Sequence, residues 1–141
     1  MRAMVHAVAG ALAFLALACS DERVEAERVV TAVDRYRRAD NAEKPTRADE
    51  LRAVPCNAAD VCRARDACVA SAEPTSKALR LKHEVEKSLA AVERGELAKD
   101  SPEAIALPKK LDDAEAFLKE GFDHLKDCDD QIMALRRKHR L

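Results

Sequence analysis

The clearest hydrophobic pattern lies in the C-terminal third of the chain, where apolar positions recur at alternating three- and four-residue steps. This seam consists of Leu111, Ala114, Leu118, Gly121, Leu125, Cys128, Ile132 and Leu135. Such spacing keeps its members on one face of a helix and predicts packing against a partner helix along the whole length. A Ser-Pro-Glu start signal at Pro102 and a seam that continues past Pro108 predict one helix over 102–138, kinked at Pro108.

Three more helices are predicted upstream. The first covers about 21–38, and a short second helix covers 47–54. The third covers 58–94, where Pro74 removes one backbone N–H and should bend the helix. The first helix is recognised by four apolar residues on one face: Ala26, Val29, Val33 and Tyr36. No alternating strand pattern bounded by glycine turns is present in the sequence, so we expect an all-α fold.

Composition supports this fold class. Ala, Leu, Glu, Lys and Arg are strong helix formers and dominate the chain, of which 36% is charged. There is no Trp, and the aromatic residues after position 19 are Tyr36, Phe117 and Phe122. We therefore expect residues 19–141 to form a single small helical bundle with an aromatic-poor core. It should be built on a long antiparallel hairpin of the helices at 58–94 and 102–138.

Four of the five cysteines are predicted to form two disulfides. They are Cys56, Cys62, Cys68 and Cys128. Cys62 and Cys68 are separated by about 9 Å along one helix, and Cys56 and Cys68 by about 18 Å. Both separations exceed the about 7 Å that a disulfide allows between Cα atoms. The pairing that remains is Cys56–Cys62 with Cys68–Cys128.

The register of the hairpin agrees with the second bridge. Cys68 lies 26 residues before Arg94, and Cys128 lies 26 residues after Pro102. Two antiparallel helices joined between Arg94 and Pro102 would therefore bring the two cysteines level. A helix that began at Pro108 instead would misalign them by about 10 Å.

The N-terminus has the pattern of an export signal. Arg2 precedes an apolar run from Ala7 to Ala18, which is shorter than the about 20 residues of a membrane span. The run ends in Ala16-Leu17-Ala18-Cys19, and residues 1–19 resemble a bacterial lipoprotein signal, with Ala16 where a large aliphatic residue is usual. The resemblance implies removal of residues 1–18 and lipidation of Cys19. Simple secretion after the same cleavage site, and an uncleaved anchor or buried helix, are the alternatives.

The number of cysteines favours lipidation, because assigning Cys19 to lipid leaves four, an even number that can pair as two disulfides in an oxidising compartment. The resemblance covers the signal only, and the mature domain resembles no characterised family. It implies a protein tethered to a bacterial membrane and facing the periplasm or the cell exterior; a soluble periplasmic protein is the alternative localisation.

No motif in the chain indicates catalysis. Glycine-rich phosphate loops, the nucleophile elbow and the HExxH pattern are missing from the sequence. His124 and Cys128 lie four residues apart and form a weak alternative metal pair with Cys62 or Cys68. The default expectation is no metal and no cofactor, because the cysteine spacings fit no standard zinc motif.

These observations predict a non-enzymatic, membrane-tethered lipoprotein of the cell envelope that acts as a structural or protein-interaction module. The expected partners are the membrane, through the N-terminal lipid, and an envelope protein. A net charge of −1 argues against nucleic acid. A periplasmic metal- or small-ligand-binding helical protein is the alternative. The basic end of the chain, at 136–140, is interpreted as compensation of exposed helix carbonyls, with binding to an anionic surface as the alternative.

Overall fold

The computed structural model describes residues 8–141, with side chains described from Asp21 onward. This part of the chain is helical and contains no strand, which confirms the all-α class. Its helices are α1 (Val8–Arg38), α2 (Lys44–Ala53), α3 (Ala59–Glu93), α4 (Pro102–Ile105), α5 (Leu107–Asp123) and α6 (Leu125–His139).

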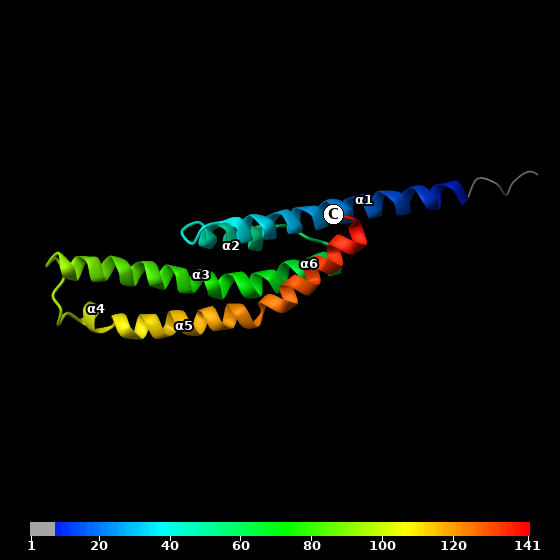
Figure 1. Ribbon diagram of the computed structural model, residues 1–141. Coiled ribbons are helices and arrows are strands. Elements are labelled where there is room, and N and C mark those ends of the chain that lie inside the picture. Colours follow the sequence, from blue (N-terminus) through cyan, green and yellow to red (C-terminus); the bar gives the residue numbers. More distant parts are fainter. Residues whose placement is uncertain (1–7) are drawn as a thin grey trace, which may run out of the picture.

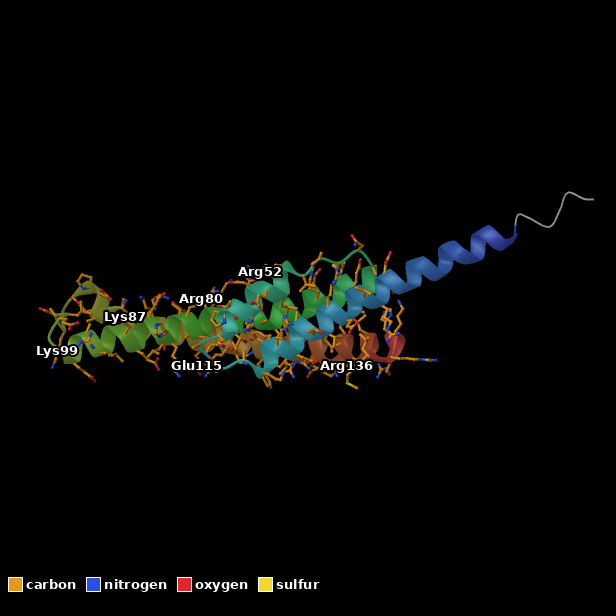
Figure 2. The ribbon with its side chains drawn as sticks, turned by 90° about the horizontal axis from the view of Figure 1, so that it is seen from above. Arg52, Arg80, Lys87, Lys99, Glu115 and Arg136 are labelled. Atoms are coloured by element: carbon orange, nitrogen blue, oxygen red, sulfur yellow. A yellow bond between two sulfur atoms is a disulfide. The ribbon has the colours of Figure 1, made fainter. Side chains whose placement is uncertain are left out.

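The long helix α3 is the centre of the fold and packs against each of the other described helices. α3 and α5 run side by side in opposite directions and form the predicted hairpin, while α1 and α2 cover the first half of α3 (Figure 1). The hairpin extends past the α1–α2 loop, and we call residues 87–110 the arm. Figure 2 shows Lys99 at the tip of the arm and Arg136 at the opposite end of the bundle.

The hydrophobic core lies where α1, α2, the first half of α3 and α6 meet. Its members are Ala26, Val29, Val30, Val33, Ala48, Leu51, Val61, Ala64, Cys68, Ala72, Cys128, Ile132 and Leu135. Most of these side chains are small, and Phe122 is 73% exposed. The core therefore buries little area per residue compared with the about 150–250 Å² that an aromatic side chain buries.

The helix predicted over 102–138 is interrupted at Ala106 and again at His124, and this part of the prediction is wrong. Pro108 lies in the first turn of α5 and so begins a helix rather than kinking one, because it has no N–H for the carbonyl four residues back. The second break lets α6 turn away from α5 and cross toward α1, where Ile132 joins the core (Figure 1).

The other helices follow the predicted order with shifted ends. The backbone of α1 is helical from Val8, so the helix starts before the predicted position 21. α3 is a single helix through Pro74, as expected. Near this proline the Thr75 hydroxyl donates to the Ser71 carbonyl at 3.0 Å, and the Ser76 hydroxyl donates to the Ala72 carbonyl at 2.8 Å. These bonds use the i−4 carbonyls beside the position where Pro74 cannot donate.

Gly121 allows α5 to approach α3 closely. The Ser71 hydroxyl donates to the Gly121 carbonyl at 2.7 Å. A Cβ atom at position 121 would lie 2.8 Å from the Ser71 carbonyl oxygen and would collide with the Thr75 hydroxyl. The backbone atom cannot move aside as a flexible side chain could, so this contact requires glycine.

Both disulfides are present with the predicted pairing. Cys56 and Cys62 have Cα atoms 5.4 Å apart, and Cys68 and Cys128 have Cα atoms 4.5 Å apart. The second bridge joins positions 60 residues apart, and both of its cysteines belong to the core. It fixes the start of α6 against α3, one helical turn from the Ser71–Gly121 contact.

Replacing Gly121 by alanine should destabilise the fold. We expect the free energy of unfolding to fall by about 1–3 kcal/mol, the usual cost of overpacking a tight site. In a helix without such a contact, alanine would be more stable than glycine by about 1 kcal/mol. A fall in the free energy of unfolding therefore shows that the close contact outweighs this preference. Urea denaturation measures it. Glu120→Ala, at an exposed neighbouring position, is the matched control, and equal stability of both variants would refute the close approach.

The two disulfides should contribute unequally. For Cys68→Ala/Cys128→Ala, which opens a 60-residue separation, loop-closure entropy predicts that the free energy of unfolding falls by about 4 kcal/mol. For Cys56→Ala/Cys62→Ala, which opens a six-residue separation, the predicted fall is about 2 kcal/mol. Thermal unfolding of the two double variants measures this difference. Non-reducing peptide mapping of the parent chain checks the pairing, and a dominant Cys62–Cys68 or Cys56–Cys128 peptide would contradict it.

Candidate functional site

The predicted lipidation site lies outside the described side chains. The backbone at Cys19 is helical, but the first side chain described is that of Asp21, and residues 1–7 are not described. Among the described residues, no helix combines the length and the apolar character needed to cross a membrane.

The alternative metal pair is not available in this disulfide-bonded structure. The Cys128 sulfur is bonded to Cys68, and His124 is exposed at the break between α5 and α6. Metal binding by cysteine requires a free thiolate. His124 and Cys128 therefore do not form a ligand pair here.

Five of the eight residues of the predicted seam are buried, and three leucines of it are exposed. α5 packs against α3 and its sequence neighbours α4 and α6, and against no other described helix. Ala114, Gly121 and Cys128 on one side of the seam are buried against α3. Leu111, Leu118 and Leu125 on the other side are 40–48% exposed. The expectation of packing along the whole seam is therefore wrong for these leucines, because a single partner helix covers only one flank of it.

These leucines share one side of α5 and the start of α6 with an exposed phenylalanine. They are spaced seven residues apart, and Phe122 lies one turn from both Leu118 and Leu125. We call this surface the apolar stripe; it consists of Leu111, Leu118, Phe122 and Leu125. The sequence pattern identified three of its members, but not the side on which α3 would lie.

Two ion pairs lie beside the apolar stripe. Lys119 Nζ lies 2.6 Å from an Asp123 carboxylate oxygen, and Lys126 Nζ lies 2.5 Å from an Asp130 oxygen. Both pairs are four residues apart on the same helix face. Figure 2 shows Glu115 on the exposed surface of the same hairpin. Asp112, Glu115 and Glu120 lie outside these pairs, so the surroundings of the stripe carry a net negative charge.

A second group of polar residues lies where three helices meet. Glu22 comes from α1, Asp60 from the first turn of α3, and Lys138 and His139 from the last turn of α6. We call these four residues the polar corner. They are separated by up to 117 positions in the sequence, and only the crossing of α6 toward α1 brings them together.

Lys138 is the cation of the polar corner. Its ammonium donates to Glu22 and to Asp60, the latter at 2.8 Å. These two carboxylates raise the pKa of Lys138, and the bond from Lys138 is the main cause that lowers the pKa of Asp60. Both groups are therefore charged at neutral pH.

His139 lies beneath this ion pair. Its side chain is 8% exposed, and its Nε2 atom has no hydrogen-bond partner. The nearest acceptor is a Glu22 oxygen at 3.7 Å, which is too long for a hydrogen bond. A buried polar atom without a partner costs about 1–3 kcal/mol, so this arrangement needs a reason.

Ion pairs hold the ends of the helices that form the polar corner. Arg136 Nη2 contacts both Asp34 carboxylate oxygens, at 2.8 and 2.9 Å, and so ties α6 to α1. Glu25 accepts the backbone N–H groups of Asn57 and Ala58, which lowers its pKa. The basic run does lie in the last turn of α6, where the sequence predicts compensation of helix carbonyls, and Arg136 and Lys138 in addition pair with acids of other helices.

Two grooves on the described surface are lined by no residue of the apolar stripe or the polar corner. A groove of about 450 Å³ separates the α1–α2 loop from α3 and includes Pro45, Leu79 and His83. A second, of about 580 Å³, lies between α1 and α2 and includes Val24 and Thr31. Neither brings a hydroxyl or thiol nucleophile together with a histidine. The apolar stripe and the polar corner are therefore the candidate sites.

The apolar stripe and the polar corner are the two features of the described surface that bear on function. No protein-family model, no curated protein and no solved structure matches this chain.

Proposed function

We propose that this chain is a non-enzymatic, membrane-tethered lipoprotein of the cell envelope that acts as a protein-interaction module. The observation that carries the proposal is the apolar stripe. Leu111, Leu118 and Phe122 on α5 and Leu125 at the start of α6 are 40–73% exposed, and neither α1 nor α2 contacts α5. Contiguous apolar patches of this kind mark interaction surfaces, because burying them in a partner removes apolar area from water.

Export is supported by the cysteines. Structural disulfides persist in oxidising compartments such as the bacterial periplasm and are rare in the cytosol. Two disulfides account for four cysteines, and the fifth, Cys19, lies at the end of the segment that resembles a lipoprotein signal. Lipidation of Cys19 would tether the mature chain at its N-terminus within α1, with the arm at the far end of the fold.

The proposed partner is an envelope protein that offers an apolar helix or loop to the stripe. The two lysines beside the stripe are paired with aspartates, so the surface lacks the free positive charge that nucleic acid requires. A membrane-bound interaction module therefore fits these observations better than a binder of polyanions. The runner-up, a metal or small-ligand binder at His124 and Cys128, lacks a free thiolate.

Lipidation predicts a defined mass for the mature N-terminus and loss of membrane association when Cys19 is replaced. The mature chain should carry a diacyl or triacyl group on Cys19 in N-terminal mass spectrometry, and Cys19→Ala should move the protein from the membrane to the soluble fraction. The lipid supplies about 0.8 kcal/mol per buried CH₂ group, which is why its removal releases the chain. Cys62→Ala, which also removes one cysteine, is the control. An unmodified Cys19 in a membrane-bound protein would refute the tether.

Interaction through the stripe predicts position-specific crosslinks in native membranes. A photo-reactive residue in place of Phe122 should give one adduct of defined mass, and the same residue in place of Ala116, an exposed position two residues from Leu118, should not. Adding Leu118→Glu should remove the adduct by placing a charge in the apolar contact. Ala116→Glu is its matched control. Equal crosslinking at both positions would contradict an interaction through the stripe. An adduct of twice the chain mass would show that the chain binds a second copy of itself and not another envelope protein.

A further inference from the structure

We propose that the polar corner binds a divalent transition-metal ion, with Glu22, Asp60 and His139 as its ligands. One donor atom from each residue lies within 4.8 Å of the other two. Imidazole nitrogen and carboxylate oxygen are standard ligands of Zn²⁺, and three protein ligands leave a fourth position open. This site is separate from the interaction surface of the proposed function.

The position of His139 is the observation that distinguishes this site from an ordinary acidic cluster. Its side chain is more than nine-tenths buried, and its unpartnered Nε2 points toward Glu22 at 3.7 Å. A tetrahedral ion with bonds of about 2.1 Å holds its ligand atoms about 3.4 Å apart. The observed separation is therefore too long for a hydrogen bond and close to that of two ligands on one ion.

Asp60 and Glu22 need only small movements to complete the site. Neither carboxylate is fully buried, and both side chains keep about a third of their surface or less exposed. Closing the widest donor separation from 4.8 Å to about 3.4 Å is within reach of side-chain rotation. The backbone that carries the ligands stays in place, because Arg136 and Glu25 hold the same helix ends.

Lys138 occupies the position that we propose for the ion. Its ammonium now bridges Glu22 and Asp60, so the corner already holds a cation between the two carboxylates. The Lys138 side chain is half exposed and can turn outward into water. A divalent ion in its place would neutralise both carboxylates, bind the His139 nitrogen and leave none of these groups unpartnered. Lys138 is thus an internal competitor of the metal.

Metal binding would join α1, α3 and α6 at the end of the bundle nearest to Cys19. Glu22 follows that cysteine by three residues. An ion that binds only the folded chain stabilises it by an amount that grows with the logarithm of its free concentration relative to Kd. The site would therefore stiffen the part of the fold that leads to the proposed tether.

The test is a titration of the purified, disulfide-bonded chain without a histidine tag, in a Cys19→Ala background that removes the free thiol. We expect Zn²⁺ to bind at one ion per chain by calorimetry and to raise the unfolding temperature. Co²⁺ in its place should give the visible absorption of a tetrahedral site. His139→Ala should weaken binding by more than the about 10-fold that loss of an outer-shell partner costs. His124→Ala, which removes an exposed histidine, is the matched control.

Lys138→Met provides the second arm, because it removes the competitor and keeps the length of the side chain. Its affinity for Zn²⁺ should exceed that of the parent chain, whereas a merely structural corner gives no gain. Asp60→Asn keeps the shape of the site and should also weaken binding, so it tests the same ligand set where the His139→Ala variant does not fold. Absence of stoichiometric binding, equal binding by the His139→Ala and His124→Ala variants, or no gain in Lys138→Met would each overturn the proposal.

Discussion

The joint between α3 and the last two helices is the constraint on which the structure depends. There the Cys68–Cys128 bond and the Ser71–Gly121 contact hold two helices at a distance that only small residues allow. A core of alanine and valine buries too little area to fix such long helices by itself, so covalent and close-packed contacts take that role. This joint sets both the position of α5 and the starting point of α6.

The exposure of the apolar stripe follows from the same joint. Because α5 approaches α3 through Ala114 and Gly121, its small residues face the partner helix and its leucines lie to one side. A third helix could cover them, but α1 and α2 pack only beside the first half of α3 and do not contact α5 (Figure 1). The hairpin that stabilises the fold thus leaves a surface suited to a partner.

The opposite end of the molecule is held by ion pairs in addition to apolar packing. After the break at His124, α6 crosses to α1, and its last turn meets acids from α1 and α3. Arg136 and Lys138 are paired there, while His139 is buried beside them without a partner. One helix break therefore creates the polar corner and separates it from the stripe along the length of the molecule (Figure 2).

The sequence alone determined the helical class, the hairpin and the disulfide pairing, because helix rise and periodicity are fixed and few cysteine pairs satisfy them. It also placed Leu118 and its neighbours on one helix face. The breaks at Ala106 and His124, the side of that face covered by α3 and the meeting of Glu22, Asp60 and His139 were decided only by the tertiary structure. Local spacing defines which residues share a face, whereas the packing of distant helices decides what that face meets.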